Sequence, residues 1–445
     1  MVPIVELKDL SVRYSKFADW ILNNFNLKIY QGEIIVLTGR SGCGKSTLLK
    51  LINGILPGLV PAEIEGDIKY SGRSVREMDT GQRAQKSGTV FQNPELQLLN
   101  NYVIEELPEN FTDEQNYIER LGLKHLLNRR TAELSGGEKQ KAAIISVLLQ
   151  ETPVMLFDEP SSNLDETSSA EFYSILKEIK NQKNTAIVLV EHWIKNAAGI
   201  ADRIYNIDGK EEIIEISATD AFGIPEMPAP DTEPGSTPLL TAENLSAKVN
   251  GTALFKNVNL NIYPGEIVGM TGPNGSGKST LAEIISGLKK SRTGSIKFNG
   301  KKTNAGSGNI GLVLQNPYHQ VFGYSVREEV EFGAKNFNKY TPEKSDTVIL
   351  NFNLSDLVNK PVYLISHGEL ERTILASAFM TEQALLILDE PFQGLGVEGT
   401  KKVIDLISRD LNKKRSILLI THNRSLMKSC CSRILKLENG KLYEE

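Results

Sequence analysis

The phosphate-binding pattern G-x-x-x-x-G-K-[ST] occurs twice in this chain, and it limits the possible folds more than any other feature. The first copy spans residues 39–47 and the second spans residues 272–280. Each copy follows a short apolar run, residues 34–37 or 267–270, and precedes a stretch that favours helix. A strand, a glycine-rich loop and a helix N-terminus in this order aim several backbone N–H groups at one anion. The sequence therefore predicts one nucleotide phosphate site in each half of the chain.

The side chains of these two loops suit a nucleotide bound together with Mg²⁺. Lys45 and Lys278 would reach the outer phosphates, and the hydroxyls of Ser46 and Ser279 can bind Mg²⁺. The residues expected to hold nucleotide in the loops are Gly39, Ser41, Gly42, Cys43, Gly44, Lys45, Ser46, Thr47, Gly272, Asn274, Gly275, Ser276, Gly277, Lys278, Ser279 and Thr280.

The duplication extends well beyond the two loops. Each half continues, in the same order, with a Gln, a Ser-x-Gly-Glu turn, an Asp-Glu pair and a His. They are Gln92, Ser135-Gly136-Gly137-Glu138, Asp158-Glu159 and His192, repeated as Gln315, Ser366-His367-Gly368-Glu369, Asp389-Glu390 and His422. A chain of 445 residues is long enough for two domains. We expect them at residues 1–215 and 239–445, joined by a proline-rich linker at residues 216–238.

Apolar runs between helical stretches predict an α/β fold in each half. Residues 154–157, 186–190, 385–388 and 417–420 are almost continuously apolar. Such runs indicate strands of a parallel sheet that is buried on both faces. Alternating segments near the start of each half, at residues 4–14, 20–30, 240–249 and 255–263, predict further strands.

The Asp-Glu pairs end two of these apolar runs and so lie where an α/β sheet binds its ligands. Asp158 and Asp389 can orient Mg²⁺, and Glu159 and Glu390 can polarise the attacking water, since phosphoryl transfer needs mainly positioning and charge stabilisation. The other polar residues that close strands, expected to contact the γ-phosphate, Mg²⁺ or the water, are His192, His422, Gln92 and Gln315.

Composition excludes some classes of protein. The formal net charge of −5 argues against nucleic acid as the main partner. No apolar run approaches the ~18 to 20 residues that span a bilayer, and the N-terminus does not resemble a secretory signal. The three cysteines, Cys43, Cys430 and Cys431, predict reduced thiols in a cytoplasmic protein.

The phosphate loop, Gln, Ser-Gly-Gly-Glu signature, Asp-Glu pair and His, in this order and twice over, resemble the ATP-binding cassette (ABC) ATPases. The resemblance implies two P-loop NTPase domains, each with a RecA-like core, an antiparallel β subdomain and a helical subdomain, and it implies ATP and Mg²⁺ as cofactors. It further implies that the two cassettes pair head to tail within the chain. The signature residues that would complete the nucleotide sites are Ser135, Gly136, Gly137, Glu138, Ser366 and Gly368.

The two halves depart from the family pattern in different ways. His367 stands where the first signature glycine is expected, so a side chain replaces close backbone approach to phosphate. Tyr14 lies where the family places an aromatic ring under adenine, and Val249 takes that position in the second half.

Under the implied head-to-tail pairing, the altered signature at His367 completes the site built on Lys45 and Glu159. The intact signature of the first half completes the site built on Lys278 and Glu390. We therefore expect both sites to bind ATP and the site built on Lys278 and Glu390 to hydrolyse it faster.

Among ABC ATPases, the Gln-loop segments at residues 91–98 and 315–322 resemble those of the energy-coupling factor (ECF) transporters. That resemblance implies an ATPase that energises uptake of a vitamin, a vitamin precursor or a transition metal. The implied partners are a transmembrane coupling subunit and, through it, a substrate-binding membrane subunit. The implied location is peripheral, on the inner face of the cell membrane.

Two alternatives stand beside this interpretation. One is a soluble tandem cassette protein that acts on the ribosome, a class that typically carries a long, charged, helical linker instead of the short proline-rich one expected here. The other is a sugar-importer ATPase, which fits the Asn-Pro-x-x-Gln segments less well.

Overall fold

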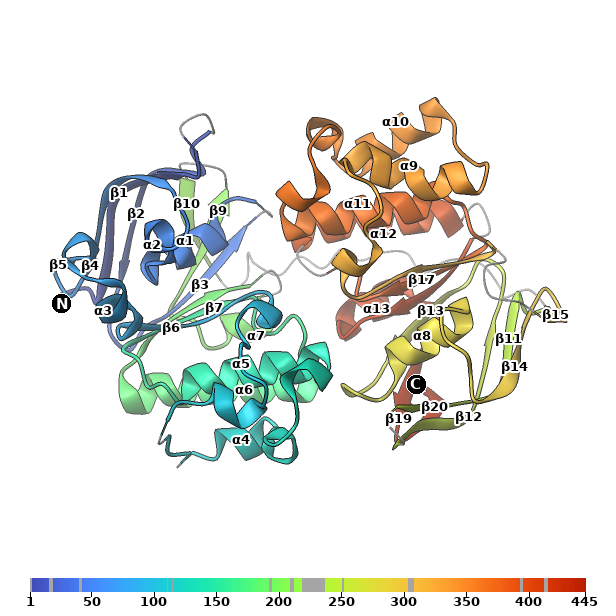
Figure 1. Cartoon of the computed structure of the whole chain (residues 1–445), viewed down its shortest axis with the longest axis horizontal. Coiled ribbons are helices and arrows are strands. Elements are labelled where there is room, and N and C mark those ends of the chain that lie inside the picture. Colours follow the sequence, from blue (N-terminus) through green and yellow to red (C-terminus); the bar gives the residue numbers. More distant parts are fainter. Residues whose placement is uncertain are drawn as a thin grey trace. The chain divides into compact units, whose positions relative to one another are not determined.

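A computed structural model gives the fold of the chain (Figure 1). The structure describes residues 2–15, 19–39, 42–109, 111–113, 115–191, 194–208, 212–217, 237–249, 252–302, 308–392, 395–411 and 415–445. The chain divides into two compact units, Met1–Gly223 and Ile224–Glu445, which are described separately. The finer boundaries expected at residues 216–238 stay predictions, because most of that segment lies outside the described residues.

The main sheet of the first unit is parallel except at one edge. Its strand order is β10-β9-β3-β8-β7-β6, and only the pair β9–β10 is antiparallel. The strands are β3 (Ile34–Gly39), β6 (Ser87–Val90), β7 (Val154–Asp158), β8 (Ala186–Val190), β9 (Arg203–Asp208) and β10 (Glu212–Ile216). Strands β7 and β8 are buried along their whole length, as their apolar sequences predict.

A second, antiparallel sheet of order β2-β1-β4-β5 lies beside this core. Its strands are β1 (Val5–Arg13), β2 (Leu22–Ile29), β4 (Glu63–Tyr70) and β5 (Arg73–Ser74), so the two strands predicted at the start of the chain are confirmed. The helices are α1 (Lys45–Ile52), α2 (Ile55–Gly58), α3 (Thr80–Ala84), α4 (Tyr117–Arg120), α5 (Gly136–Leu148), α6 (Glu166–Lys183) and α7 (Lys195–Ala198). Helices α5 and α6 cover one face of the main sheet, whereas α1 and the small sheet cover the other (Figure 1).

The second unit repeats this architecture. Its main sheet has the order β16-β17-β18-β13-β19-β20 and its small sheet the order β12-β11-β14-β15. The strands are β11 (Leu240–Val249), β12 (Thr252–Ile262), β13 (Ile267–Thr271), β14 (Thr293–Phe298), β15 (Lys301–Lys302), β16 (Ile310–Val313), β17 (Leu385–Asp389), β18 (Ser416–Ile420), β19 (Arg433–Glu438) and β20 (Lys441–Glu444). The helices are α8 (Lys278–Ser286), α9 (Val326–Asn336), α10 (Pro342–Asn351), α11 (His367–Met380), α12 (Gly396–Leu411) and α13 (Arg424–Cys430). The predicted α/β fold with two tandem P-loop domains is therefore confirmed.

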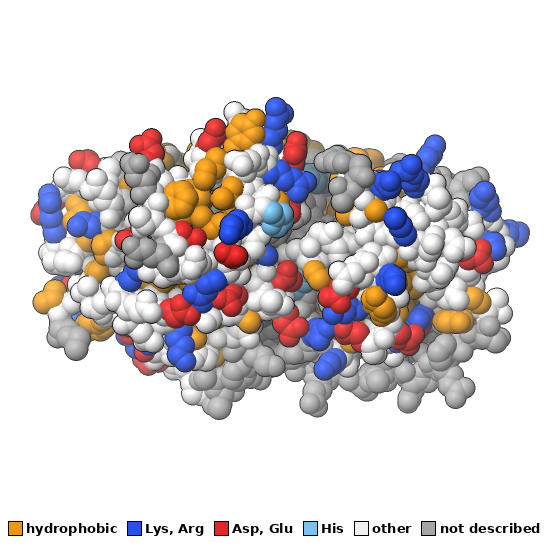
Figure 2. Space-filling view, turned by 90° about the horizontal axis from the view of Figure 1, so that it is seen from below, with side chains coloured by type: hydrophobic (Ala, Val, Ile, Leu, Met, Phe, Trp, Pro, Cys, Tyr) orange, Lys and Arg blue, Asp and Glu red, His pale blue; other side chains and the backbone are white. Residues whose placement is uncertain are grey.

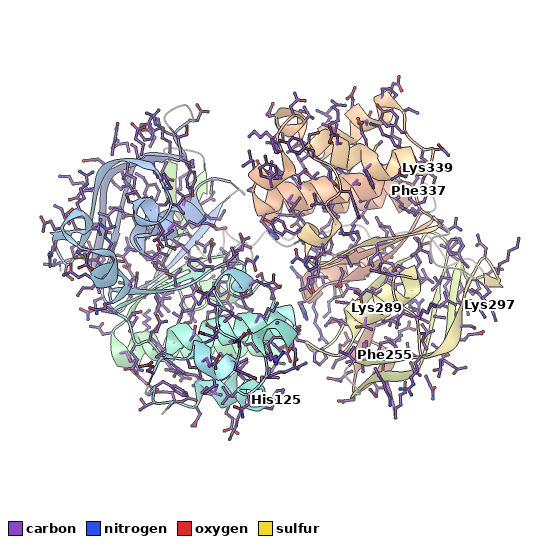
Figure 3. All side chains as sticks on the ribbon, viewed as in Figure 1. His125, Phe255, Lys289, Lys297, Phe337 and Lys339 are labelled. Atoms are coloured by element: carbon purple, nitrogen blue, oxygen red, sulfur yellow. The ribbon has the colours of Figure 1, made fainter. Side chains whose placement is uncertain are left out.

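The phosphate loop of each unit packs against the small antiparallel sheet. Phe255 on β12, labelled in Figure 3, is almost fully buried. A Cβ placed on Gly277, in the phosphate loop, would lie 3.0 Å from the Phe255 ring. In the first unit a Cβ on Gly44 would meet Ile21 and Leu22 at the same distance of 3.0 Å. The loop therefore packs on the small sheet in both units, at positions where only glycine fits without displacement.

The two units differ most in the segment that follows the Gln loop. In the second unit it forms the two helices α9 and α10, whereas in the first it contains the single four-residue helix α4 and short 3-10 turns among the described residues. The first segment is also shorter in sequence.

The surface carries both signs of charge. Acidic and basic side chains are interspersed over the face seen in Figure 2, in keeping with a net charge of only −5. Within the part of the chain that the structure describes, no helix is long and apolar enough to cross a membrane.

Candidate nucleotide sites

Four neighbouring parallel strands bring the predicted site residues together in each unit. In the first unit, β6, β7, β8 and β3 are adjacent in the sheet and point the same way. Their carboxyl ends carry Gln92, the pair Asp158-Glu159, Glu191 and the phosphate loop. The same order recurs in the second unit with β16, β17, β18 and β13. Residues far apart in the sequence thus meet at one sheet edge, the place where α/β proteins bind ligands.

The lysine of each phosphate loop folds back over its own loop. Lys45 Nζ donates to the Gly39 carbonyl at 2.9 Å, and Lys278 Nζ donates to the Gly272 carbonyl at 2.8 Å. Both lysines are less than a tenth exposed. The ammonium group is therefore held at the loop, where it can exchange a carbonyl for a phosphate oxygen.

The first glycine of each loop is dictated by close backbone packing. Gly39 has φ of +140° and Gly272 has φ of +148°. A Cβ would lie 2.3 Å from the Ile207 carbonyl oxygen in the first unit and 2.2 Å from that of Leu437 in the second. No side chain fits there, and the positive φ disfavours one as well.

The hydroxyl that follows the lysine is paired with the aspartate of the next-but-one strand. Ser46 hydrogen-bonds Asp158, and Ser279 hydrogen-bonds Asp389. Burial raises the pKa of each aspartate to about 6. Asp158 Oδ1 has no hydrogen-bond partner among the described residues. A buried carboxylate oxygen beside a hydroxyl in this position suits a hard cation.

The two glutamates have the same unusual backbone. Glu159 has φ of +50° and Glu390 has φ of +51°, a region that few non-glycine residues adopt. The N–H of Glu159 donates to the Val190 carbonyl and that of Glu390 to the Ile420 carbonyl, each at 2.9 Å. These bonds fix each glutamate to the end of the neighbouring strand.

In the second unit the end of β18 holds the Glu390 carboxylate. Thr421 Oγ1 donates to Glu390 Oε2 at 3.0 Å, and His422 Nε2 lies 3.6 Å from Glu390 Oε1. Burial, with a contribution from Asp389, raises the pKa of Glu390 to about 8. His422 therefore lies next to Glu390, and its predicted contact with the γ-phosphate stays a prediction.

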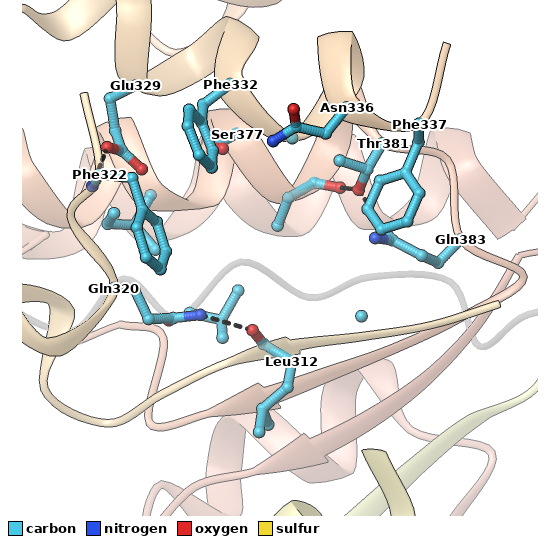
Figure 4. A pocket seen from close by; sticks show the side chains of 15 residues that line it. Leu312, Gln320, Phe322, Glu329, Phe332, Asn336, Phe337, Ser377, Thr381 and Gln383 are labelled. Carbon is cyan, nitrogen blue, oxygen red and sulfur yellow. Dashed lines mark hydrogen bonds between the residues drawn. The ribbon is translucent and has the colours of Figure 1, made fainter. Parts of the chain in front are cut away.

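Each Gln loop is braced by a second glutamine that sequence reasoning did not assign a role. Gln97 Oε1 accepts from the Phe91 N–H at 3.1 Å. Gln320 Oε1 accepts from the Leu314 N–H at 2.6 Å, and its Nε2 donates to the Leu312 carbonyl at 2.8 Å (Figure 4). These bonds fix the backbone just before Gln92 and Gln315. The signal was present in the repeated Asn-Pro-x-x-Gln pattern.

A cavity of about 340 Å³ adjoins the second Gln loop. It lies between β16, α9 and α11, and Phe322 stacks on Phe332 at its wall, with ring centroids 5.2 Å apart (Figure 4). Glu329 accepts from the Phe322 N–H at 2.7 Å and orders the loop that bears this ring.

The signature residues begin helices in both units. Ser135 is the N-cap of α5 and Ser366 the N-cap of α11, and each forms a capping box with the glutamate three residues later. Glu138 and Glu369 accept from these serine N–H groups at 2.7 Å. The turn shape thus survives the replacement of glycine by His367.

The signature helix is linked to the turn after the Gln loop by different contacts in the two units. In the first, Lys139 pairs with Glu95 at 2.6 Å. In the second, the His367 ring lies 5.9 Å from the Tyr318 ring, centroid to centroid. The side chain that departs from the family pattern therefore packs against its own unit.

Tyr14 lies beside the first phosphate loop. Its hydroxyl is 3.2 Å from Thr47 Oγ1, and the residue is 39% exposed. From this position the ring of Tyr14 could stack on adenine, as the sequence predicts, although this contact stays a prediction. Val249, its counterpart, is 42% exposed and offers no ring.

Two predicted site residues, Ser41 and His192, lie outside the described residues, so their roles stay predictions. The structure instead places a group that sequence reasoning did not assign at the end of β8. Glu191 is 3% exposed and accepts from the Tyr173 hydroxyl at 2.8 Å.

Comparison with known proteins identifies the repeated unit. Residues 22–162 and 255–393 match the family model described as "ABC transporter". A "Putative ABC transporter ATP-binding protein" from Treponema denticola is 32% identical over 99% of this chain and 96% of its own length. A protein of the same description from Methanosarcina acetivorans is 30% identical over 99% of this chain and 90% of its own.

Solved structures with two cassettes match nearly the whole chain. One titled "RNase-L Inhibitor" has a TM-score of 0.69 at 20% identity and covers 98% of this chain and 90% of its own. A "Model of ribosome-bound archaeal Pelota and ABCE1" has a TM-score of 0.74 at 20% identity, covering 98% of this chain and 78% of its own. At this level of identity the match establishes the shared fold.

These neighbours correct the expectation drawn from the Gln loops. Three solved chains that match along 98% of this sequence are titled as an RNase-L inhibitor, a complex with an archaeal ribosome recycling factor and a ribosome-bound model, and none of the three is titled as an ECF component. The predicted ECF importer, its transmembrane coupling subunit and the peripheral membrane location are therefore withdrawn. The physical reason is that the Gln loop serves nucleotide chemistry common to all cassettes, so its sequence is a poor guide to the partner.

Proposed function

Because the chain belongs to the ABC transporter family and is an ATPase of that family, we propose that each of its cassettes hydrolyses ATP with Mg²⁺, and that the energy is used on the ribosome. The observation that carries the ATPase part is the repeated set of phosphate loop, aspartate and glutamate at the ends of adjacent parallel strands. Its repetition in two units argues against chance assembly of any one of these groups.

Binding of ATP would begin at the phosphate loop. Backbone N–H groups and the N-terminus of α1 or α8 cradle the phosphates, and the lysine moves from the loop carbonyl to a phosphate oxygen. In the first cassette Tyr14 would stack on adenine, which helps that cassette to retain nucleotide.

The residues that would hold Mg²⁺ are Ser46, Gln92 and Asp158 in the first cassette and Ser279, Gln315 and Asp389 in the second. Bound Mg²⁺ neutralises phosphate charge during transfer. The described residues contain no group of three or more His, Cys, Asp or Glu side chains that could hold a metal alone. This donor set fits an ion that is shared with the phosphates and keeps several waters.

Hydrolysis then needs a water aligned with the γ-phosphate. Glu390 is the residue that would accept its proton, with Thr421 and His422 fixing the carboxylate. Glu159 and His192 would take these parts in the first cassette. The expectation that the second cassette turns over faster stays a prediction, and it is tested by the substitutions discussed below.

The proposal that the ribosome is the partner is supported by the solved structures titled "ribosome recycling factor aABCE1" and "ribosome-bound archaeal Pelota and ABCE1". The net charge is −5, and acidic and basic side chains are interspersed on the face seen in Figure 2, so recognition would rely on ribosomal proteins more than on RNA phosphates. A second candidate follows from the curated relatives, whose description is "Putative ABC transporter ATP-binding protein". It is the ATP-binding subunit of a transporter of undefined class.

Cosedimentation separates the two candidates. The chain carrying both E159Q and E390Q, which should retain ATP, is mixed with ribosomes and, separately, with membranes from the same lysate. Pelleting with ribosomes in the presence of ATP, and its loss in a control with K45A and K278A, would support the proposed function. Recovery with membranes alone would replace it with the second candidate.

A further inference from the structure

The first cassette contains a buried acidic group that the ATPase chemistry described above does not use. Glu191 ends β8 and is 3% exposed. Its carboxyl group accepts from the Tyr173 hydroxyl of α6 at 2.8 Å, and it also hydrogen-bonds both the side chain and the backbone of Ser161. Ser161 lies two residues after Glu159. Glu191 therefore joins α6 and β8 to the loop that bears the glutamate of the first cassette.

The second cassette has no such acid, which makes it an internal control. Thr421 stands at the place of Glu191 and donates directly to Glu390 at 3.0 Å. By the alignment of the two halves, Phe392 replaces Ser161 and Ile404 replaces Tyr173, and both are buried. The polar cluster is thus specific to the first cassette.

Each element packed around Glu191 contributes an identifiable group. Helix α6 supplies Tyr173, the loop after β7 supplies Ser161 and the charge of Glu159, and β3 supplies the Leu37 carbonyl, which accepts the Glu191 N–H at 3.1 Å. Burial, with a smaller contribution from Glu159, raises the pKa of Glu191 to about 8, against the effect of the hydrogen bonds from Tyr173 and Ser161. A protonated carboxyl group still accepts hydrogen bonds on its oxygens and has one O–H to donate.

We propose that Glu191 is a positioning residue for Glu159: it carries a proton while the first cassette turns over, and loss of this proton stops that cassette. The inference rests on the proposed hydrolysis of ATP by the first cassette. When Glu191 releases its proton to solvent, a second negative charge appears in a buried place beside Glu159. Two neighbouring buried carboxylates repel each other, so the loop after β7 moves or Glu159 binds a proton and ceases to act as a base.

The test compares pH profiles of the two cassettes. E390Q isolates turnover by the first cassette and E159Q isolates turnover by the second. In E390Q we expect ATPase activity to fall by up to about tenfold per pH unit above the pKa of Glu191. Adding E191Q, which mimics the protonated acid, should remove that alkaline fall, whereas E159Q should lack it from the start. E191A, which also loses the contacts with Tyr173 and Ser161, should lower turnover at every pH.

A second readout follows the proton itself. The infrared band of a protonated carboxyl group, taken as the difference between the wild-type chain and E191Q, should be present at neutral pH and disappear in alkali. Absence of that band at neutral pH would overturn the inference, and so would an alkaline fall that E191Q leaves in place. Equal losses in E191Q and E191A without any change of profile would show a structural role only and would also overturn it.

The design distinguishes this inference from the function on which it rests. A wild-type chain without ATPase activity would contradict the proposed function, while the carboxyl band would still decide whether Glu191 holds its proton. If E390Q alone has no turnover, the first cassette does not hydrolyse ATP by itself, and the proposed role of Glu191 in its turnover is overturned.

Discussion

The hydroxyl of Thr421 donates a 3.0 Å hydrogen bond to the carboxylate of Glu390, and it does so from the first residue after β18. The backbone of Glu390 is bonded to the last residue of the same strand, Ile420. One strand end therefore fixes both the main chain and the side chain of the glutamate expected to act on water. This arrangement makes the contribution of a single hydroxyl measurable.

Replacing Thr421 with valine should slow the second cassette without weakening ATP binding. The change keeps the shape of the side chain and removes its donor. Above pH 8 the Glu390 carboxyl group is mostly ionised. A hydrogen bond to a charged group contributes about 1.5–3 kcal/mol, so kcat measured there should fall by roughly 10- to 100-fold. Steady-state ATPase assays in the E159Q background, with nucleotide affinity measured in parallel, provide the test. T421S keeps the hydroxyl and is the matched control; a similar loss in T421S would point to packing instead of the hydrogen bond.

The two glutamates should contribute unequally to total turnover. Removing a general base typically costs ~10²- to 10⁴-fold in rate. We expect E390Q to remove most of the ATPase activity of the chain and E159Q to leave much of it. The reason is that the altered signature at His367 is expected to slow the site of Glu159 and not the site of Glu390. Both variants should still bind ATP. Equal losses in the two variants would contradict the asymmetry.

The predictable parts of this protein are those that local chemistry determines. The phosphate loops could be located because Gly39 and Gly272 meet backbone oxygens at 2.3 and 2.2 Å, and such contacts leave glycine as the one choice. The aspartates and glutamates could be located because they follow apolar strands of a parallel sheet. Because the strands are adjacent and parallel, the order of the sheet places the phosphate loops, aspartates and glutamates of each unit at one edge.

Contacts that depend on packing could not be predicted. Tyr173 and Glu191 are 18 residues apart and meet only because α6 lies on the sheet. The contact between Tyr318 and His367 likewise depends on how α11 packs against the Gln loop. The partner was predicted wrongly for a related reason: motifs that bind nucleotide are common to the whole family, whereas the surfaces that bind partners carry no such motif.

The stability of the first unit should depend on pH through Glu191. Its pKa is about 8 in the folded chain and 4.5 is its ordinary value. Below the ordinary value both states are protonated, so the folded state has its full stability; as pH rises between the two values, unfolding releases the proton and stability falls. Relative to E191Q, the free energy of unfolding of the wild-type chain should therefore fall by at most about 1.4 kcal/mol per pH unit between these two pKa values.

Urea unfolding of the wild-type chain and E191Q across this pH range provides the measurement. E119Q is a suitable control because the Glu119 side chain is 67% exposed and forms a surface ion pair with Lys124. Parallel stability curves for the wild-type chain and E191Q would show that Glu191 ionises as an ordinary carboxyl group.

The first glycine of the second phosphate loop should be far less tolerant of alanine than the glycine three positions later. In Gly272→Ala the new Cβ would lie 2.2 Å from the Leu437 carbonyl oxygen, a backbone atom that cannot move without disturbing β19. In Gly275→Ala no described atom lies within 4 Å of the new Cβ, and the cost arises only from φ of +75°. We expect a loss of roughly 3 kcal/mol or more for G272A and about 1 kcal/mol for G275A. Thermal unfolding of both variants tests the difference, and nucleotide affinity measured at a temperature where both are folded separates stability from binding. Similar melting temperatures for the two variants would show that the loop relaxes around the added methyl group, and the close packing of Gly272 on β19 would then not be what requires glycine there.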